Sequence, residues 1–196
     1  MYFDLTPELL LRAYASGIFP MGDETGEIKW YSPNPRCIFD LDNFHIPKRL
    51  LRTYNQRNFE IGINSAWDQV IRQCSRRNTD SGVWITEPII EAYTNLHKLG
   101  FAHSVETYMD GVLVGGLYGV CLRGAFMGES MFHTATDASK IALVFLVQRM
   151  KERNYKLLDT QFSTSHLRTF GASLVSREEY LERLREAMKL DCSFVP

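Results

Sequence analysis

Two strand-like segments, residues 102–109 and 112–122, are separated only by Asp110 and Gly111. An Asp-Gly pair accepts the positive φ angles of a tight hairpin turn, whose twist matches that of two antiparallel strands. A third strand-like run begins after Gly124. The chain is therefore expected to fold around an antiparallel sheet built from these three segments.

Patterns outside these segments predict helices and further strands. Apolar spacing and capping residues predict helices that begin at Pro7 and after Ser176, and others at residues 47–57, 65–77, 87–99, 137–153 and 165–170. Strands are predicted at residues 37–41, 59–63 and 156–161. This order indicates an α+β fold with a mixed, largely antiparallel sheet, similar to that of acetyltransferases (GNAT-like).

Residues 17–36 contain a high density of glycine and proline among aromatic residues, which predicts an ordered loop without regular structure. A polar stretch at residues 78–82 interrupts the pattern and marks the expected domain boundary. We expect a small α+β N-terminal domain, made of a helix and aromatic loop at 1–36 and basic helices at 37–80. The catalytic domain is expected at 81–196.

Composition narrows the class of protein. The formal net charge of −1 gives no global attraction to nucleic acid, so any such contact must use the local basic segment at residues 48–77. The four cysteines are far apart, which argues against a zinc site and a disulfide framework. No apolar run approaches the roughly 20 residues that span a bilayer. We expect a cytoplasmic monomer that uses no metal, no cofactor and no membrane.

Two carboxylates lie within apolar, strand-like runs. Glu129 stands between Phe126 and Phe132, and Asp159 follows two leucines. Burial removes hydration from a carboxylate, so each acid is expected to bind a cation, handle a proton or pair with an arginine. Strand alternation places Asp159 and Gln161 on one face, and Glu129 on the same face as Met127 and Met131.

Seven short motifs occur in order along the chain, at residues 17–20, 30–36, 82–85, 115–119, 128–132, 138–140 and 158–161. Together they resemble the motifs of the bacterial leucyl/phenylalanyl-tRNA-protein transferases. The resemblance implies an enzyme that moves Leu or Phe from aminoacyl-tRNA to the α-amine of proteins beginning with Arg or Lys. Such transfer marks the acceptor for N-end rule degradation, and use of Met as a donor stays open.

The resemblance also implies roles for individual residues. Asp159 and Gln161 match the catalytic relay, and Glu129 matches the acceptor site. We hypothesise that Asp159 removes the amine proton, because an amide oxygen is a poor base. The tRNA 3′ end is assigned to Met21, Trp30, Tyr31 and Trp84. Family members usually have Trp where this chain has Met21, and an additional segment before the first helix.

Two further sets of residues complete the expected site. The apolar pocket for the donor side chain is assigned to Leu117, Phe126, Met127 and Leu146. Contact with the tRNA backbone is assigned to Lys48, Arg49, Arg52, Arg76 and Arg77. Tyr14 and Tyr93 are expected to pack on helices with their hydroxyls at the edge.

Two alternative functions are weighed against the transferase. The first is a coenzyme-A-dependent N-acyltransferase of the same fold, which needs a glycine-rich turn for the pyrophosphate, whereas residues 133–138 contain no glycine. The second is a non-catalytic RNA-binding adaptor that uses the basic segment and exposed aromatic residues.

Overall fold

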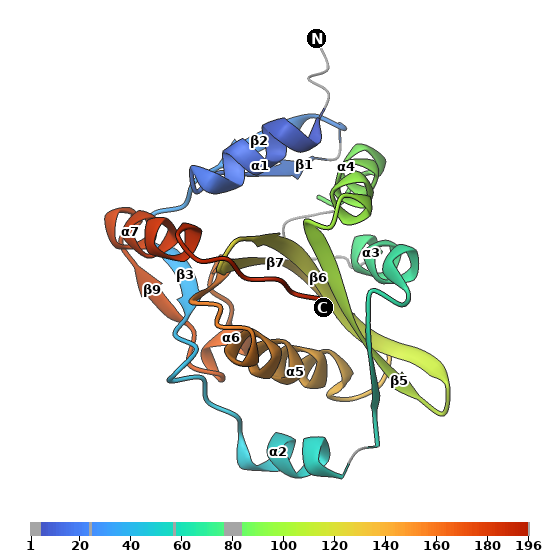
Figure 1. The fold of residues 1–196 in the computed structure, drawn as a ribbon. Helices are drawn as coiled ribbons and strands as arrows, with labels where there is room; N and C mark the ends of the chain where they lie inside the picture. Colours follow the sequence, from blue (N-terminus) through green and yellow to red (C-terminus); the bar gives the residue numbers. More distant parts are fainter. Residues whose placement is uncertain (1–4, 24, 57, 77–83, 196) are drawn as a thin grey trace.

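A seven-stranded sheet forms the centre of the computed structural model, which describes residues 5–23, 25–56, 58–76 and 84–195 (Figure 1). The strand order is β4-β5-β6-β7-β8-β3-β9. The bounds are β3 (Arg36–Phe39), β4 (Glu60–Ile63), β5 (Ala102–Met109), β6 (Val112–Leu122), β7 (Ala125–His133), β8 (Leu157–Gln161) and β9 (Ser173–Val175).

All neighbouring strands of this sheet are antiparallel except β7 and β8, which are parallel. Parallel neighbours require a crossover, and helix α5 (Ala138–Glu152) supplies it. The predicted α+β fold, with three antiparallel strands, a long helix and a further strand in acetyltransferase-like order, is confirmed. Strand β9 was not predicted, since three residues are too few to show a period.

Helices cover both faces of the sheet and create two separate cores. One core contains buried residues of α1 (Pro7–Ala15), α3 (Trp67–Ser75), α4 (Glu87–Lys98) and α7 (Arg177–Met188). The other core contains buried residues of α5 and α2 (Lys48–Asn55), with α6 (Ser165–Arg168) packed against it. We call these the α4-side core and the α5-side core. Figure 1 shows α2 at the end of the molecule opposite to α1.

The close approach of α5 to the sheet explains two of the sequence motifs. A Cβ atom placed on Gly115 of β6 would lie only 2.6 Å from the Cβ of Ala138, at the start of α5. Such a distance is far below van der Waals contact, so only glycine fits at this position. Glycine on β6 and alanine on α5 therefore set the spacing between sheet and helix.

The segment predicted to be an irregular loop instead contains a two-stranded antiparallel sheet, β1 (Phe19–Gly22) and β2 (Ile28–Tyr31). The prediction was wrong because aromatic and β-branched residues between the turn-forming residues favour pairing. Pro20 is tolerated because each strand of a lone pair needs donors on one side only. The backbone N–H of Gly22 donates to the carbonyl of Trp84 at 3.0 Å, which ties this hairpin to the segment before α4.

Strand membership crosses the expected domain boundary. β3 begins at Arg36 and continues into residues 37–80, and β4 lies within them, yet both strands pair within the seven-stranded sheet. The segment expected to complete a small N-terminal domain is thus part of the central sheet. Residues 77–83, where the boundary was predicted, lie outside the described residues.

Candidate active site

Glu129 occupies a β-bulge on β7. The register pairs Tyr118 with Ser130 and Gly119 with Gly128, so Glu129 is an extra residue between these pairs. Beyond the bulge the alternation is inverted, and Met127 lies in the α4-side core whereas Met131 packs against the α5-side core. The expectation that Glu129 shares a face with both methionines was wrong for this reason.

The bulge directs the Glu129 carboxylate toward three polar side chains. The Tyr14 hydroxyl donates to its Oε1 at 2.7 Å, and the Tyr93 hydroxyl donates to its Oε2 at 3.4 Å. The two hydroxyl oxygens also lie in contact with each other, and because each hydroxyl has one proton, the three bonds do not all form at once. The amide nitrogen of Gln161 donates to Oε1 at 2.9 Å. Glu129 is 9% exposed, so the carboxylate is nearly closed off from water.

Tyr14 and Tyr93 are functional candidates that the sequence interpretation missed. Their hydroxyls were expected at the edge of the helices α1 and α4, yet both residues are fully buried and meet over Glu129. Each tyrosine looks locally like an ordinary packed aromatic residue. Only the packing of α1 against α4 brings the two hydroxyls to one carboxylate.

The surroundings of Glu129 change its protonation. Burial raises the pKa of Glu129 to about 8, and the negative charge of Asp159 acts in the same direction, whereas the Tyr14 hydrogen bond lowers it. Burial also raises the pKa of Tyr14 and Tyr93 well above the usual value, so both hydroxyls remain hydrogen-bond donors. A carboxyl group that titrates near neutral pH suits the binding of a cation or the handling of a proton.

Asp159 is fully buried and surrounded by donors. Its Oδ1 accepts from Arg36 Nε at 2.9 Å and from the Gln161 backbone N–H at 2.8 Å. Its Oδ2 accepts from Arg36 Nη2 at 2.5 Å and from the Tyr180 hydroxyl at 2.8 Å. An ionised carboxylate has about four lone-pair sites, and four donors occupy them here. This geometry argues against the hypothesis that Asp159 takes the amine proton.

Arg36 is a third residue that the sequence interpretation missed. Its guanidinium lies between the rings of Phe19 and Tyr180, with its central carbon 4.7 and 4.5 Å from the ring centroids. Its Nη1 also donates to the carbonyl of Gly17 at 3.1 Å. A buried acid requires a counter-charge, but the sequence did not indicate which arginine provides it. The pairing of β3 with β8 brings Arg36 next to Asp159.

Gln161 links the two acids. Its backbone is in the left-handed region, with φ of 63°, and its N–H is held by Asp159. Its side chain extends to Glu129 instead, so Asp159 and Gln161 do not point at one common ligand. Because the amide nitrogen donates to Glu129, the amide oxygen is turned away and can accept a hydrogen bond.

The residues assigned to the tRNA 3′ end fall on different surfaces. Opposite partners in an antiparallel pair share a face, so Phe19, Met21 and Tyr31 lie on one face of the β1-β2 hairpin and Trp30 on the other. Trp84 and Met21 pack partly against the α4-side core. The structure brings together Met21 and Tyr31, but it does not bring Trp30 to the same face.

The residues assigned to the donor pocket are also divided. Leu117, Phe126 and Leu146 are buried together in the α5-side core. Met127 lies in the α4-side core, on the other face of the sheet. The four residues therefore do not line a common pocket.

The basic residues assigned to the tRNA backbone do not form one patch. Lys48, Arg49 and Arg52 lie on α2, beside the α5-side core, whereas Arg76 follows α3, which packs in the α4-side core. Arg49 is held by the buried carboxylate of Asp137 through bonds of 2.5 and 2.8 Å. Arg77 lies outside the described residues.

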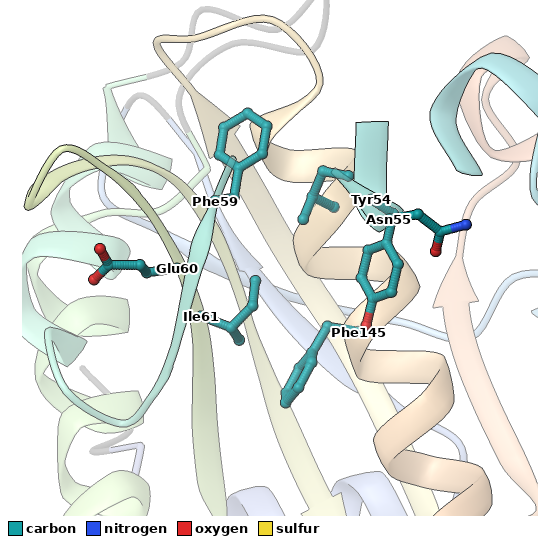
Figure 2. Close-up of a pocket in the computed structure, with 7 residues that line it drawn as sticks. Tyr54, Asn55, Phe59, Glu60, Ile61 and Phe145 are labelled. Atoms are coloured by element: carbon teal, nitrogen blue, oxygen red, sulfur yellow. The ribbon is translucent and has the colours of Figure 1, made fainter. Parts of the chain in front are cut away.

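A pocket of about 660 Å³ lies away from this site, between α2, α5 and the segment that contains β4 (Figure 2). Its lining residues are Tyr54, Asn55, Phe59, Glu60, Ile61, Ile141 and Phe145. None of the residues assigned to the site belongs to it. Within the described ranges, no cluster of His, Cys, Asp or Glu side chains is suited to a metal ion, and no helix has the length and apolarity needed to cross a membrane.

Known proteins and family models match nearly the whole chain. The family described as "Leucyl/phenylalanyl-tRNA protein transferase" matches residues 38–185, and its N-terminal domain matches residues 3–34. A leucyl/phenylalanyl-tRNA–protein transferase of Gloeobacter violaceus is 50% identical over 99% of this chain and 100% of its own length. A protein of the same name from Salinibacter ruber is 48% identical over 98% of this chain and 84% of its own length.

Solved structures are less similar to this chain than the two relatives above. The structure of L-PGS from Bacillus licheniformis overlaps with a TM-score of 0.48 at 16% identity, over 86% of this chain and 63% of that chain.

Proposed function

Because this chain belongs to the leucyl/phenylalanyl-tRNA protein transferase family, we propose that it transfers Leu or Phe from aminoacyl-tRNA to proteins beginning with Arg or Lys. The transfer forms a peptide bond with the α-amine and marks the acceptor for N-end rule degradation in the cytoplasm. The structural observation that best supports this proposal is the buried carboxylate of Glu129, which accepts hydrogen bonds from Tyr14, Tyr93 and Gln161.

Glu129 is proposed to bind the positive charge of the acceptor. Its Oε1 already accepts two bonds, whereas its Oε2 has only the long contact with Tyr93 among the described residues. A cation that reaches Oε2 would meet a carboxylate in poorly hydrated surroundings, where charges attract more strongly than in water. This arrangement favours Arg or Lys over a neutral first residue.

Gln161 is proposed to receive the attacking amine, with its amide oxygen accepting one N–H. The aminoacyl ester is already activated, so positioning the two substrates provides most of the catalysis. An α-amine has an ordinary pKa of about 8 and needs no strong base to become neutral near that pH. Asp159 would then act by position, because it fixes the backbone of Gln161 while Arg36 holds it in place.

The donor is proposed to lie on the other side of β7. Its Leu or Phe side chain stays assigned to Leu117, Phe126 and Leu146, all three of which are buried in the α5-side core. Met21 and Tyr31 share the hairpin face that suits the terminal adenine, where stacking on an aromatic ring is worth about 1–3 kcal/mol. The exposed residues Lys48, Arg52 and Arg76 remain candidates for the tRNA backbone.

The start of α5 disfavours the coenzyme-A-dependent alternative. Pyrophosphate would bind at that helix N-terminus, where free N–H groups attract anions. The buried carboxylate of Asp137 stands there instead, paired with Arg49 and with Lys140, the latter at 3.0 Å. The two cations at this helix end therefore already have an anionic partner.

The experiment combines the purified protein with labelled Leu-, Phe- or Met-tRNA and peptides that begin with Arg, Lys or Ala. We expect transfer of Leu and Phe to the Arg and Lys peptides and none to the Ala peptide. Retention of tRNA without transfer would indicate the RNA-binding adaptor. Transfer that depends on acetyl-coenzyme A would indicate the acyltransferase.

A further inference from the structure

An exposed aromatic side chain directly follows the glutamine of the site. Phe162 is 45% exposed, although Gln161 and Asp159 before it are buried. Its ring packs edge-on against Phe19, with centroids 5.7 Å apart and planes at 82°. Aromatic residues are enriched at protein–protein interfaces relative to the rest of the surface.

The backbone fixes the direction of Phe162. Gln161 has a φ of 63°, and the N–H of Phe162 donates to the carbonyl of Thr160 at 2.7 Å, which closes a tight turn at the end of β8. The turn sends the Gln161 side chain inward to Glu129 and the Phe162 side chain outward. The exposed ring is thus set by the same turn that positions the amide.

Phe19 gives the exposed ring a rigid support. It is almost fully buried, and the Arg36 guanidinium lies on its ring. Tyr31 stacks on Phe19 with centroids 6.0 Å apart and planes at 23°. Phe19 therefore separates two exposed rings: Tyr31 on the hairpin, and Phe162 next to Gln161.

We propose that Phe162 binds the apolar side chain of the second residue of the acceptor polypeptide. This inference rests on the proposed function. With the first residue's charge at Glu129 and its amine at Gln161, the second residue follows at a Cα spacing of about 3.8 Å. Phe162 directly follows Gln161 in the chain. The side chain of the acceptor's second residue is therefore expected to lie against the Phe162 ring. Tyr31 is not adjacent to Gln161 in the chain, and it stays assigned to the terminal adenine of the tRNA.

The cations beside Phe19 and Tyr31 already have partners. Arg36 pairs with Asp159, and Lys29 on β2 pairs with Asp23 at 2.8 Å. A nucleotide stacked on Phe162 would bring a phosphate toward cations that already have partners. An apolar side chain has no charge and does not need a free cation nearby.

The test uses peptides that begin Arg-Leu, Arg-Phe, Arg-Gly or Arg-Asp and are otherwise identical, with Leu-tRNA as donor. We expect the wild type to show kcat/KM about fivefold to tenfold higher for Arg-Leu and Arg-Phe than for Arg-Gly. Phe162→Ala should lose that preference, and Phe162→Leu should keep most of it. Val112→Ala, which shortens a 61% exposed side chain at the distant β5-β6 turn, should behave as the wild type.

Three results would overturn the inference. The first is transfer by the wild type without any preference for the second residue. The second is a preference that survives in Phe162→Ala. The third is a loss in Phe162→Ala that is equal for all four peptides and appears as a higher KM for Leu-tRNA, which would assign the ring to the tRNA end. Absence of transfer by the wild type would instead overturn the proposed function, and this inference with it.

Discussion

Arg36 and Asp159 form a buried, two-bond ion pair that joins β3 to β8, with Nε–Oδ1 and Nη2–Oδ2 distances of 2.9 and 2.5 Å. Arg36 also holds the carbonyl of Gly17, before β1, and Asp159 holds the backbone of Gln161. The pair therefore connects the N-terminal hairpin with the strand end that carries the proposed site. It explains why an acid can lie in the apolar strand β8.

Replacing one partner of this pair should be costly. Asp159→Asn leaves the Arg36 charge buried without a counter-charge, so we expect the free energy of unfolding to fall by about 3–5 kcal/mol. Asp191→Asn removes a 98% exposed partner of Arg123 and should change it by less than about 1 kcal/mol. Denaturant unfolding measures both. An Asp159→Asn protein that is inactive but as stable as the wild type would contradict a positioning role.

Removing the charge of Glu129 should weaken acceptor binding more than it slows the chemical step. We expect Glu129→Gln to raise the KM of an Arg peptide by about tenfold or more while kcat falls less. Glu152→Gln, a change at an exposed acid at the end of α5, serves as the control. A large fall in kcat at unchanged KM would point to proton transfer by Glu129 instead.

The pH dependence of transfer should report the pKa of Glu129. This pKa is raised to about 8, so the ionised form that attracts a cation gains population as pH rises through 8. The acceptor amine loses its proton over the same range, so log kcat/KM should rise between pH 6 and 7 with a slope of about 2, and of about 1 in Glu129→Gln. Initial rates over pH 6–9 measure the slopes. Equal slopes would show that the ionisation of Glu129 is not required.

The same carboxyl should respond to the loss of its hydroxyl donors. The Tyr14 bond to Glu129 stabilises the ionised form, so Tyr14→Phe should shift the pH profile of kcat/KM to higher pH. Tyr93→Phe removes a longer contact of 3.4 Å and should shift the profile less. A shift toward lower pH in either variant would contradict this arrangement of donors.

The raised pKa also has a consequence for stability. Glu129 takes up its proton more readily in the folded than in the unfolded chain, where its pKa is about 4.3. Its contribution to stability is therefore complete below that pH and is lost as pH rises toward 8. Glu129→Gln should flatten this part of the stability profile, which denaturant unfolding at several pH values would show.

Local sequence patterns determined most of the elements and the residues that carry chemistry. The Asp110-Gly111 turn, the period of α5 and the acids within apolar runs are properties of short windows, where chain geometry acts directly. The segment at residues 17–36 is an exception, because its many glycine and proline residues indicate a loop although it contains two short paired strands.

Only the tertiary structure decided how these residues meet. The bulge at Glu129 inverts the alternation of β7, and a two-residue period cannot show where an extra residue is accommodated. Tyr14, Tyr93 and Glu129 come from three elements, and Arg36 lies 123 residues from Asp159. A buried carboxylate must find donors wherever packing supplies them, so the sequence determined that the acids need partners, and the fold decided which partners they have.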